Sequence, residues 1–284
     1  MQNEINIQDK GRYISELVLR ENLNSVNASS REVHPKQSLY LKYVKRILDV
    51  TVAFPVCIIL LPVNFVLGIL TFFDVGNPIF FRQKRIGKDG KTFYLTKFRN
   101  MTEEKDRYGN LRPPGERVTR LGMFVRKYSL DELLNFWSIL KGDMSLIGPR
   151  PLPVEFRERF SDRHKMREVV RPGLECPCIS EKNKVRYYQE QFENDIWYVE
   201  HVSFFLDCRL CFHLVKMVFN SRERGDHAKS GGGDFLGYNA EGKAFSMRHI
   251  PEEYEKAYRQ YTELTGKDYN FKGGYYGEKF RKNT

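Results

Sequence analysis

An uncharged run of 24 residues, VTVAFPVCIILLPVNFVLGILTFF at positions 50–73, constrains this sequence more than any other feature. A helix of about 20 apolar residues is long enough to cross the hydrocarbon core of a bilayer. The run therefore predicts a membrane-embedded helix, with a buried core helix as the alternative. It contains Pro55 and Pro62, and a proline inside a helix removes a backbone donor and clashes with the preceding turn. A kink or a break is therefore expected.

The charges that flank this run indicate how it lies in the membrane. Basic residues next to a membrane segment favour the cytoplasmic side. Because both flanks are basic, both ends of the helix are predicted on the same side. We therefore favour a re-entrant helix that enters, bends near Pro62 and returns, over a helix that spans the bilayer. The flanking basic residues are Lys42, Lys45 and Arg46 before the run and Arg82, Lys84, Arg85 and Lys88 after it.

The overall charge favours an anionic partner. Lys and Arg outnumber Asp and Glu by 47 to 36, which gives a formal net charge of +11. Nucleic acid, an acidic bilayer and a phosphorylated substrate would each satisfy this charge. The uncharged run argues against nucleic acid.

The five cysteines do not suggest a disulfide framework, because their number is odd and Cys57 lies inside the apolar run. Cys176 and Cys178 could join Cys208 and Cys211 in a four-thiolate metal site. The apolar surroundings of the second pair favour thiols that serve as small core residues instead.

Residues 78–100 predict a β-hairpin. Asp89-Gly90 is a hairpin turn signal, and aromatic and β-branched residues flank it on both sides. Residues 102–118 are charged and contain Gly and Pro, so we expect a loop there. The predicted fold class is mainly α with small β-hairpin elements (α+β).

Two adjacent carboxylates, Asp131 and Glu132, lie in the segment RKYSLDELLN at 126–135. A structural interpretation explains both, because Ser129 and Glu132 have the spacing of a capping box and Asp131 would complement the helix dipole. The same position also suits phosphate chemistry, since a helix N-terminus attracts anions and Arg126 lies just upstream. An aspartate is ionised at neutral pH, and cations would offset its repulsion from a phosphate.

The segment LKGDMSLIGPRP at 140–151 contains a second candidate feature. The prolines at 149 and 151 favour an extended backbone around Arg150. This backbone would suit a guanidinium that is held towards a phosphate or a base. An ordinary rigid turn is the alternative.

Taken together and in order, these segments resemble the bacterial sugar transferase family. Its members are phosphoglycosyl transferases that start glycan assembly on a polyprenol phosphate. The resemblance covers about residues 42–220. It rests on KRILDV at 45–50, the proline-containing apolar run, FRQKRIG at 81–87, KFRNM at 97–101, SLDELLN at 129–135, LKGDMSLIGPRP at 140–151 and RPG at 171–173.

The resemblance implies a monotopic membrane enzyme on the cytosolic face of the bacterial inner membrane. It implies a UDP-sugar donor, an undecaprenyl (polyprenyl) phosphate acceptor, membrane lipid as a partner and Mg²⁺ as cofactor. By similarity, Asp131 attacks the β-phosphate, UMP leaves and a phosphosugar stays on the aspartate until the acceptor removes it. Glu132 matches the second acid, and both acids are expected to bind the metal. The residues that match substrate- and phosphate-binding positions are Lys97, Arg126, Asp143 and Arg150.

The expected organisation is a polar tail at 1–38, a re-entrant membrane helix at 39–73, a catalytic domain at 74–220 and an extension at 221–284. Segment 196–219 fits either an interfacial amphipathic helix or a core helix. Residues 174–184 depart from the family pattern, which leaves the sugar open. Within the extension, 230–239 predicts a loop and 251–264 a helix.

Other functions fit the sequence less well. Soluble metal-dependent glycosyltransferases usually carry Asp-x-Asp, which does not occur in this sequence. A non-catalytic membrane scaffold of a glycan assembly complex would keep the fold while the 174–184 segment lost donor binding. A homodimer is compatible with the long C-terminal arm.

Overall fold

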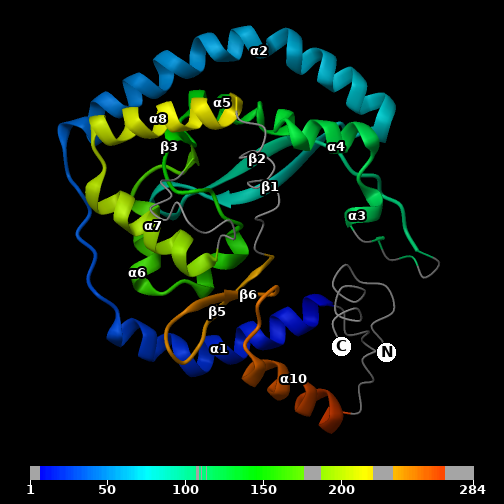
Figure 1. Cartoon of the computed structure of the whole chain (residues 1–284), viewed down its shortest axis with the longest axis vertical. Coiled ribbons are helices and arrows are strands. Elements are labelled where there is room, and N and C mark those ends of the chain that lie inside the picture. Colours follow the sequence, from blue (N-terminus) through cyan, green and yellow to red (C-terminus); the bar gives the residue numbers. More distant parts are fainter. Residues whose placement is uncertain are drawn as a thin grey trace.

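The computed structural model describes residues 7–265 apart from 107, 108, 110, 113, 176–186 and 220–232. In these residues the protein is mainly helical, with three separate two-stranded sheets. This confirms the predicted α+β class. A long helix, α2 (Lys45–Val75), arches over one end of the molecule, and the N-terminal helix α1 (Ile7–Ser29) packs with C-terminal elements at the opposite end (Figure 1).

Helix α2 (Lys45–Val75) follows a π-helical turn (Tyr40–Val44) and is continuous through Pro55 and Pro62. The helix is bent into an arch (Figure 1), so the predicted bend is present but a break at Pro62 is wrong. Both prolines are exposed. A hydrogen bond lost on the exposed side lets that side of the helix lengthen, which curves the helix without interrupting it.

One side of α2 faces the rest of the protein and the other side is bare. Asp49, Ala53, Cys57, Leu67 and Thr71 are buried, at the spacing of one helix face. With its preceding turn, α2 is long and apolar enough to cross a membrane by length and composition, the one such helix in the described residues. Its exposed large hydrophobic residues are Ile47, Val52, Phe54, Ile58, Ile59, Leu61, Val63, Phe65, Val66, Ile69, Leu70, Phe72 and Phe73.

The predicted hairpin is present. Strand β1 (Phe80–Ile86) pairs antiparallel with β2 (Thr92–Phe98). At the turn Asp89 and Gly90 have φ of 54° and 72°, and the Lys91 amide donates to the Lys88 carbonyl at 3.1 Å. Two positive φ angles are what an Asp-Gly hairpin turn requires. The end of β1 also pairs with the segment after Arg150, through a bridge between Arg85 and Pro153.

Several short elements follow the hairpin in the chain. The expected loop at 102–118 is mostly irregular, with one helical turn (α3) inside it. Gly173 cannot carry a side chain, because a Cβ there would lie 2.2 Å from the Gly148 amide nitrogen. The elements are α3 (Pro114–Arg117), α4 (Arg120–Lys127), α5 (Asn135–Lys141), the parallel strands β3 (Ser145–Ile147) and β4 (Gly173–Glu175), and α6 (Asp162–Lys165).

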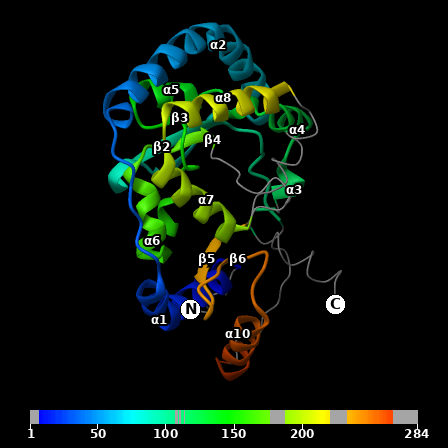
Figure 2. The same cartoon turned by 60° about the vertical axis from the view of Figure 1, so that its left-hand side comes forward.

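Segment 196–219 is divided between two helices. Helix α7 (Tyr188–His201) ends before Val202, and α8 (Phe204–Phe219) begins after it. Ile196 in α7 is fully buried, whereas Phe205 and Phe212 in α8 are 82% and 75% exposed. Each of the two expectations therefore describes one part: α7 is a core helix, and α8, beneath α2 in Figures 1 and 2, exposes an apolar face.

The N-terminal segment and the C-terminal extension pack together. Residues 7–29, expected within a polar tail, form helix α1 (Ile7–Ser29). Part of the expected 230–239 loop is strand β5 (Phe235–Tyr238), which pairs with β6 (Ala244–Ser246). The predicted helix is α10 (Glu252–Thr265). We call α1, β5, β6 and α10 the terminal module. Its core contains Ile14, Val18, Leu236, Phe245, Met247, Tyr254 and Tyr258.

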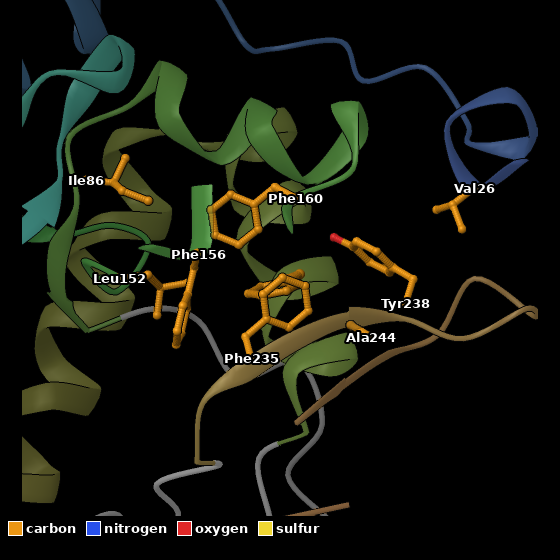
Figure 3. Packing of buried hydrophobic residues seen from close by; sticks show 9 residues of the cluster. Val26, Ile86, Leu152, Phe156, Phe160, Phe235, Tyr238 and Ala244 are labelled. Carbon is orange, nitrogen blue, oxygen red and sulfur yellow. The ribbon is translucent and has the colours of Figure 1, made fainter. Parts of the chain in front are cut away.

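A second apolar cluster joins the terminal module to the rest of the protein. In Figure 3, Phe156, Phe160 and Phe235 lie together, with Ile86 of β1 at one edge and Val26 of α1 at the other. The Phe160 and Phe235 rings are stacked with centroids 5.7 Å apart. The module is therefore part of the same packed body as the hairpin.

Candidate active site at the carboxylate pair

Asp131 and Glu132 lie on a short 3₁₀ turn (Leu130–Glu132) between α4 and α5. The expected capping box is wrong. Ser129 has a left-handed backbone with φ of 54°, and its side chain makes no capping hydrogen bond. An N-cap residue needs an extended backbone, so Ser129 does not form a capping box with Glu132. Helix α5 begins only at Asn135, so Asp131 is also not in its first turn.

The Glu132 carboxylate contacts two cations that the sequence predicted as phosphate-binding residues. The Lys97 ammonium lies 2.5 Å from Glu132 Oε1, and the nearer Arg150 guanidinium nitrogen lies 3.5 Å from the same oxygen. Strand β2 supplies Lys97, and the Pro149–Pro151 segment supplies Arg150. The fold therefore brings together three residues that are far apart in the sequence.

Asp131 is linked to the Arg126 guanidinium through the side-chain amide of Asn100. Asn100 Nδ2 donates to Asp131 Oδ2 at 3.4 Å, and Asn100 Oδ1 accepts from Arg126 at 2.8 Å. Burial raises the pKa of Asp131 above its ordinary value, and the neighbouring Glu132 adds to the increase. Lys97 and Arg126 act in the opposite direction. Both carboxylates are thus held beside positive groups, and Lys97 acts on both of them.

Asp143 is not part of this group. It follows the C-terminal end of α5, whereas the carboxylate pair precedes the N-terminal end of that helix. Seven helical residues span about 10 Å. Asp143 instead lines a pocket of about 300 Å³ with residues that include Lys88, Lys91 and Arg171.

Two residues beside the pair were not predicted as site residues. Asn100 links Arg126 to Asp131, and Arg85 is electrostatically coupled to both Glu132 and Arg150. The hairpin register contained a signal for Arg85. Phe81 is opposite Lys97, and Arg85 lies four residues further along the same strand, so it shares the face of Lys97.

The proposed metal ligands are two carboxylates only. No group of three or more His, Cys, Asp or Glu side chains with metal-site geometry occurs in the part of the chain that the structure describes. Cys176 and Cys178 lie outside the described residues, so the four-thiolate site stays a prediction. Two carboxylates fit Mg²⁺, which binds proteins through one or two carboxylates and completes its shell with water and substrate phosphates.

Comparison with known proteins identifies the family. The model of the bacterial sugar transferase family matches residues 40–221, which include α2, the hairpin and the carboxylate pair. The chain belongs to the bacterial sugar transferase family. The match ends before the strands and helix of the C-terminal extension, so these lie outside the family region.

Relatives in this family differ in the sugar in their names. The "Uncharacterized sugar transferase EpsL" of Bacillus subtilis is 39% identical over 180 residues, 63% of this chain and 88% of its own. The "UDP-N-acetylgalactosamine-undecaprenyl-phosphate N-acetylgalactosaminephosphotransferase" of Aeromonas hydrophila is 30% identical over 189 residues (62% and 44%). The "UDP-glucose:undecaprenyl-phosphate glucose-1-phosphate transferase" of Klebsiella pneumoniae is 32% identical over 181 residues (60% and 39%). The chain thus spans less than half the length of the last two.

Proposed function

We propose that the protein transfers a sugar-1-phosphate from a UDP-sugar to polyprenyl phosphate, with undecaprenyl phosphate as the acceptor, through a covalent intermediate on Asp131. The observation that carries the proposal is the Asp131–Glu132 pair with positive side chains on both sides of it, in a sugar transferase fold. The names of the Aeromonas and Klebsiella relatives support this substrate class.

The reaction balances in two steps. An Asp131 carboxylate oxygen forms a bond to the β-phosphorus of the donor, and the bond from that phosphorus to the bridging oxygen breaks, so that UMP leaves. A phosphate oxygen of the lipid then attacks the same phosphorus, and the Asp131 carboxylate is released. Both steps move a phosphoryl group between anions, so the barrier is dominated by charge repulsion.

The basic side chains lower this repulsion. Lys97 and Arg150 lie within 4 Å of Glu132, and Arg126 is held next to Asp131 by Asn100. Fixed cations at these positions stabilise charge that develops on the phosphoryl oxygens. Asp131 and Glu132 would hold Mg²⁺, which neutralises phosphate charge when bound. The two acids repel each other and are partly buried, an arrangement that a cation would stabilise.

The bare face of α2 supports a place at the membrane. The outer side of the helix exposes large hydrophobic residues along its length. Their exposure to water is unfavourable in free energy, and contact with lipid would remove this cost. Helices α4 and α8 expose Phe124 and Phe205 on the same end of the molecule (Figures 1 and 2). We propose that these faces enter the cytosolic leaflet of the inner membrane, with α2 re-entrant, so that the lipid acceptor reaches the site from that side.

The covalent step is tested by intact mass. Purified protein in detergent is incubated with Mg²⁺ and a panel of UDP-sugars, without lipid acceptor. We expect a mass gain of one sugar phosphate in the wild type and in Glu241→Gln, and none in Asp131→Asn. Glu241 is a control carboxylate because it is exposed in the turn between β5 and β6. The absence of any gain, with UMP release at background, would favour a non-catalytic scaffold.

A further inference from the structure

Arg85 occupies a position that its known contacts do not explain. It lies at the end of β1, where the backbone pairs with Pro153, so its place beside the Pro149–Pro151 segment is fixed. One guanidinium nitrogen donates to Gln83 Oε1 at 2.6 Å. The Nε atom is buried and has no hydrogen-bond partner in the described residues. A buried donor without an acceptor is costly, and it calls for a partner.

The surrounding charges indicate what kind of partner is suitable. Burial and the nearby positive charge of Arg150 lower the pKa of Arg85 to about 10, whereas Glu155 and Glu132 partly compensate. Two guanidinium groups close enough to repel each other are stabilised when an anion lies between them. Lys97 is bonded to Glu132 in the same region, so the Glu132 charge is already shared with another cation.

We propose that Arg85 and Arg150 form a two-guanidinium site for the diphosphate of the nucleotide donor. The identity of the nucleotide rests on the proposed function. A diphosphate offers several acceptor oxygens to two planar guanidinium groups, which bind phosphate through paired N–H donors. The site lies on the Glu132 side of the pair, because Arg150 contacts Glu132 and Arg85 is bridged to Pro153, three residues after Arg150.

The proposed diphosphate site lies away from the side on which the lipid acceptor is expected to approach. Helix α4 carries Arg126 in its last turn and exposes Met123 and Phe124. It is tied to the C-terminal end of α2 by the hydrogen bond from Thr119 to Asp74. The apolar approach is therefore on the Arg126 side, and the lipid phosphate is expected there. The soluble donor binds on the other side of the carboxylates, between Arg85 and Arg150.

Binding of UDP tests the site without turnover. Affinities for UDP with Mg²⁺ and for farnesyl phosphate are measured by calorimetry on the full chain in detergent. The variants are Arg85→Gln, Arg85→Lys and the control Lys84→Gln, whose side chain leaves the opposite face of β1 and lies over the Tyr94 ring. We expect Arg85→Gln to weaken UDP binding about 10- to 100-fold. Arg85→Lys should be intermediate, with Lys84→Gln and farnesyl phosphate binding unchanged.

The outcomes separate this site from the proposed function. Wild-type protein that binds UDP no more tightly than Arg85→Gln does would overturn the diphosphate site and leave the transferase reaction standing. Weaker farnesyl phosphate binding with unchanged UDP binding would overturn the donor assignment. Wild-type protein that binds no UDP and forms no adduct would overturn the proposed function itself. Failure of both Arg85 variants to fold, measured by thermal melting, would show a structural role and also overturn the site.

Discussion

At the scale of single residues, the two adjacent carboxylates have different surroundings. Glu132 contacts Lys97 directly, whereas the Asn100 amide donates to Asp131 and accepts from Arg126. Glu132 is thereby held in place by an ion pair, and Asp131 accepts a hydrogen bond from a neutral amide. Neighbouring acids with different environments are how one site assigns different tasks to the same functional group.

The first residue-scale prediction concerns pH. Asp131 must be ionised to attack, and Lys97 lowers its pKa while Glu132 raises it. Lys97→Met should therefore raise the pKa of Asp131 and move the acid limb of adduct formation to higher pH. Glu132→Gln should move that limb to lower pH. The measurement is the initial rate of adduct formation against pH, by intact mass at fixed Mg²⁺.

The position of the acid limb is the deciding quantity. At neutral pH both variants should also be slower, Lys97→Met by about 10²-fold, because a cation next to the phosphoryl group is lost. Limbs that move in the same direction in both variants would show that Asp131 is not the titrating group. The control Lys84→Gln should reproduce the wild-type profile.

The sequence predicted most members of this site but not its geometry. Lys97, Arg126 and Arg150 were expected near the carboxylates, and each is there. Asp143 was named with them because its motif resembles that of the family, and in the structure α5 lies between it and the pair. Arg85 was missed because the bridge that places it beside the segment of Arg150 joins it to Pro153, a residue far away in the chain.

At the scale of elements, the first turns of α2 are anchored by buried polar contacts. Lys45 forms a buried ion pair with Asp207 of α8, and the hydroxyls of Tyr40 and Tyr198 donate to the same carboxylate. The Arg46 guanidinium donates to the Ile139 and Leu140 carbonyls near the end of α5, at 2.6 and 2.8 Å. The apolar helix is thus fixed to the body at its polar end.

Loss of the buried ion pair should destabilise the protein. Lys45→Met leaves the Asp207 charge buried without its cation, and breaking such a pair costs about 3–5 kcal/mol. Lys42→Met, at an exposed position beside Tyr43, should change stability by less than about 0.5 kcal/mol. Unfolding of both variants is followed by denaturant titration in detergent. Equal stabilities would show that the tyrosine hydroxyls suffice to hold Asp207.

Short sequence motifs predicted an element correctly where the residues of the motif alone determine the backbone conformation. Asp89-Gly90 predicted the hairpin correctly because few other residue pairs accept two positive φ angles. The capping box failed because Ser129 adopts a positive φ in the turn between α4 and α5. Nothing in the sequence indicated that segment 196–219 divides into two helices at Val202, because the apolar residues continue through that position.

At the scale of the whole molecule, helix α1 near the N-terminus packs against the elements near the C-terminus. Lys10 pairs with Glu255, Ser15 donates to the Leu236 carbonyl and Asn22 donates to the Tyr238 carbonyl. The sequence indicated a polar tail because the apolar residues of α1 are sparse and their partners lie more than 200 residues away. The sequence pattern of α1 alone cannot show that its apolar side packs against residues near the C-terminus.

The joint between the terminal module and the body determines how the protein unfolds. Phe235 packs on Phe160, and Tyr238 makes contacts with the Ser161 amide and the His164 ring at 3.1 and 2.7 Å. Because strand β5 belongs to both packed clusters, damage in the module should spread to the body.

Ile14, fully buried in the module, tests this coupling. Ile14→Ala should lower the free energy of unfolding by about 2–5 kcal/mol, through lost burial and the cavity left behind. Leu264→Ala, at a side chain that is 88% exposed, should have little effect. If the module and body form one cooperative unit, secondary-structure and aromatic circular dichroism of Ile14→Ala should report one transition. Two separated transitions would mean that the module unfolds on its own and that the aromatic joint transmits little stability to the site.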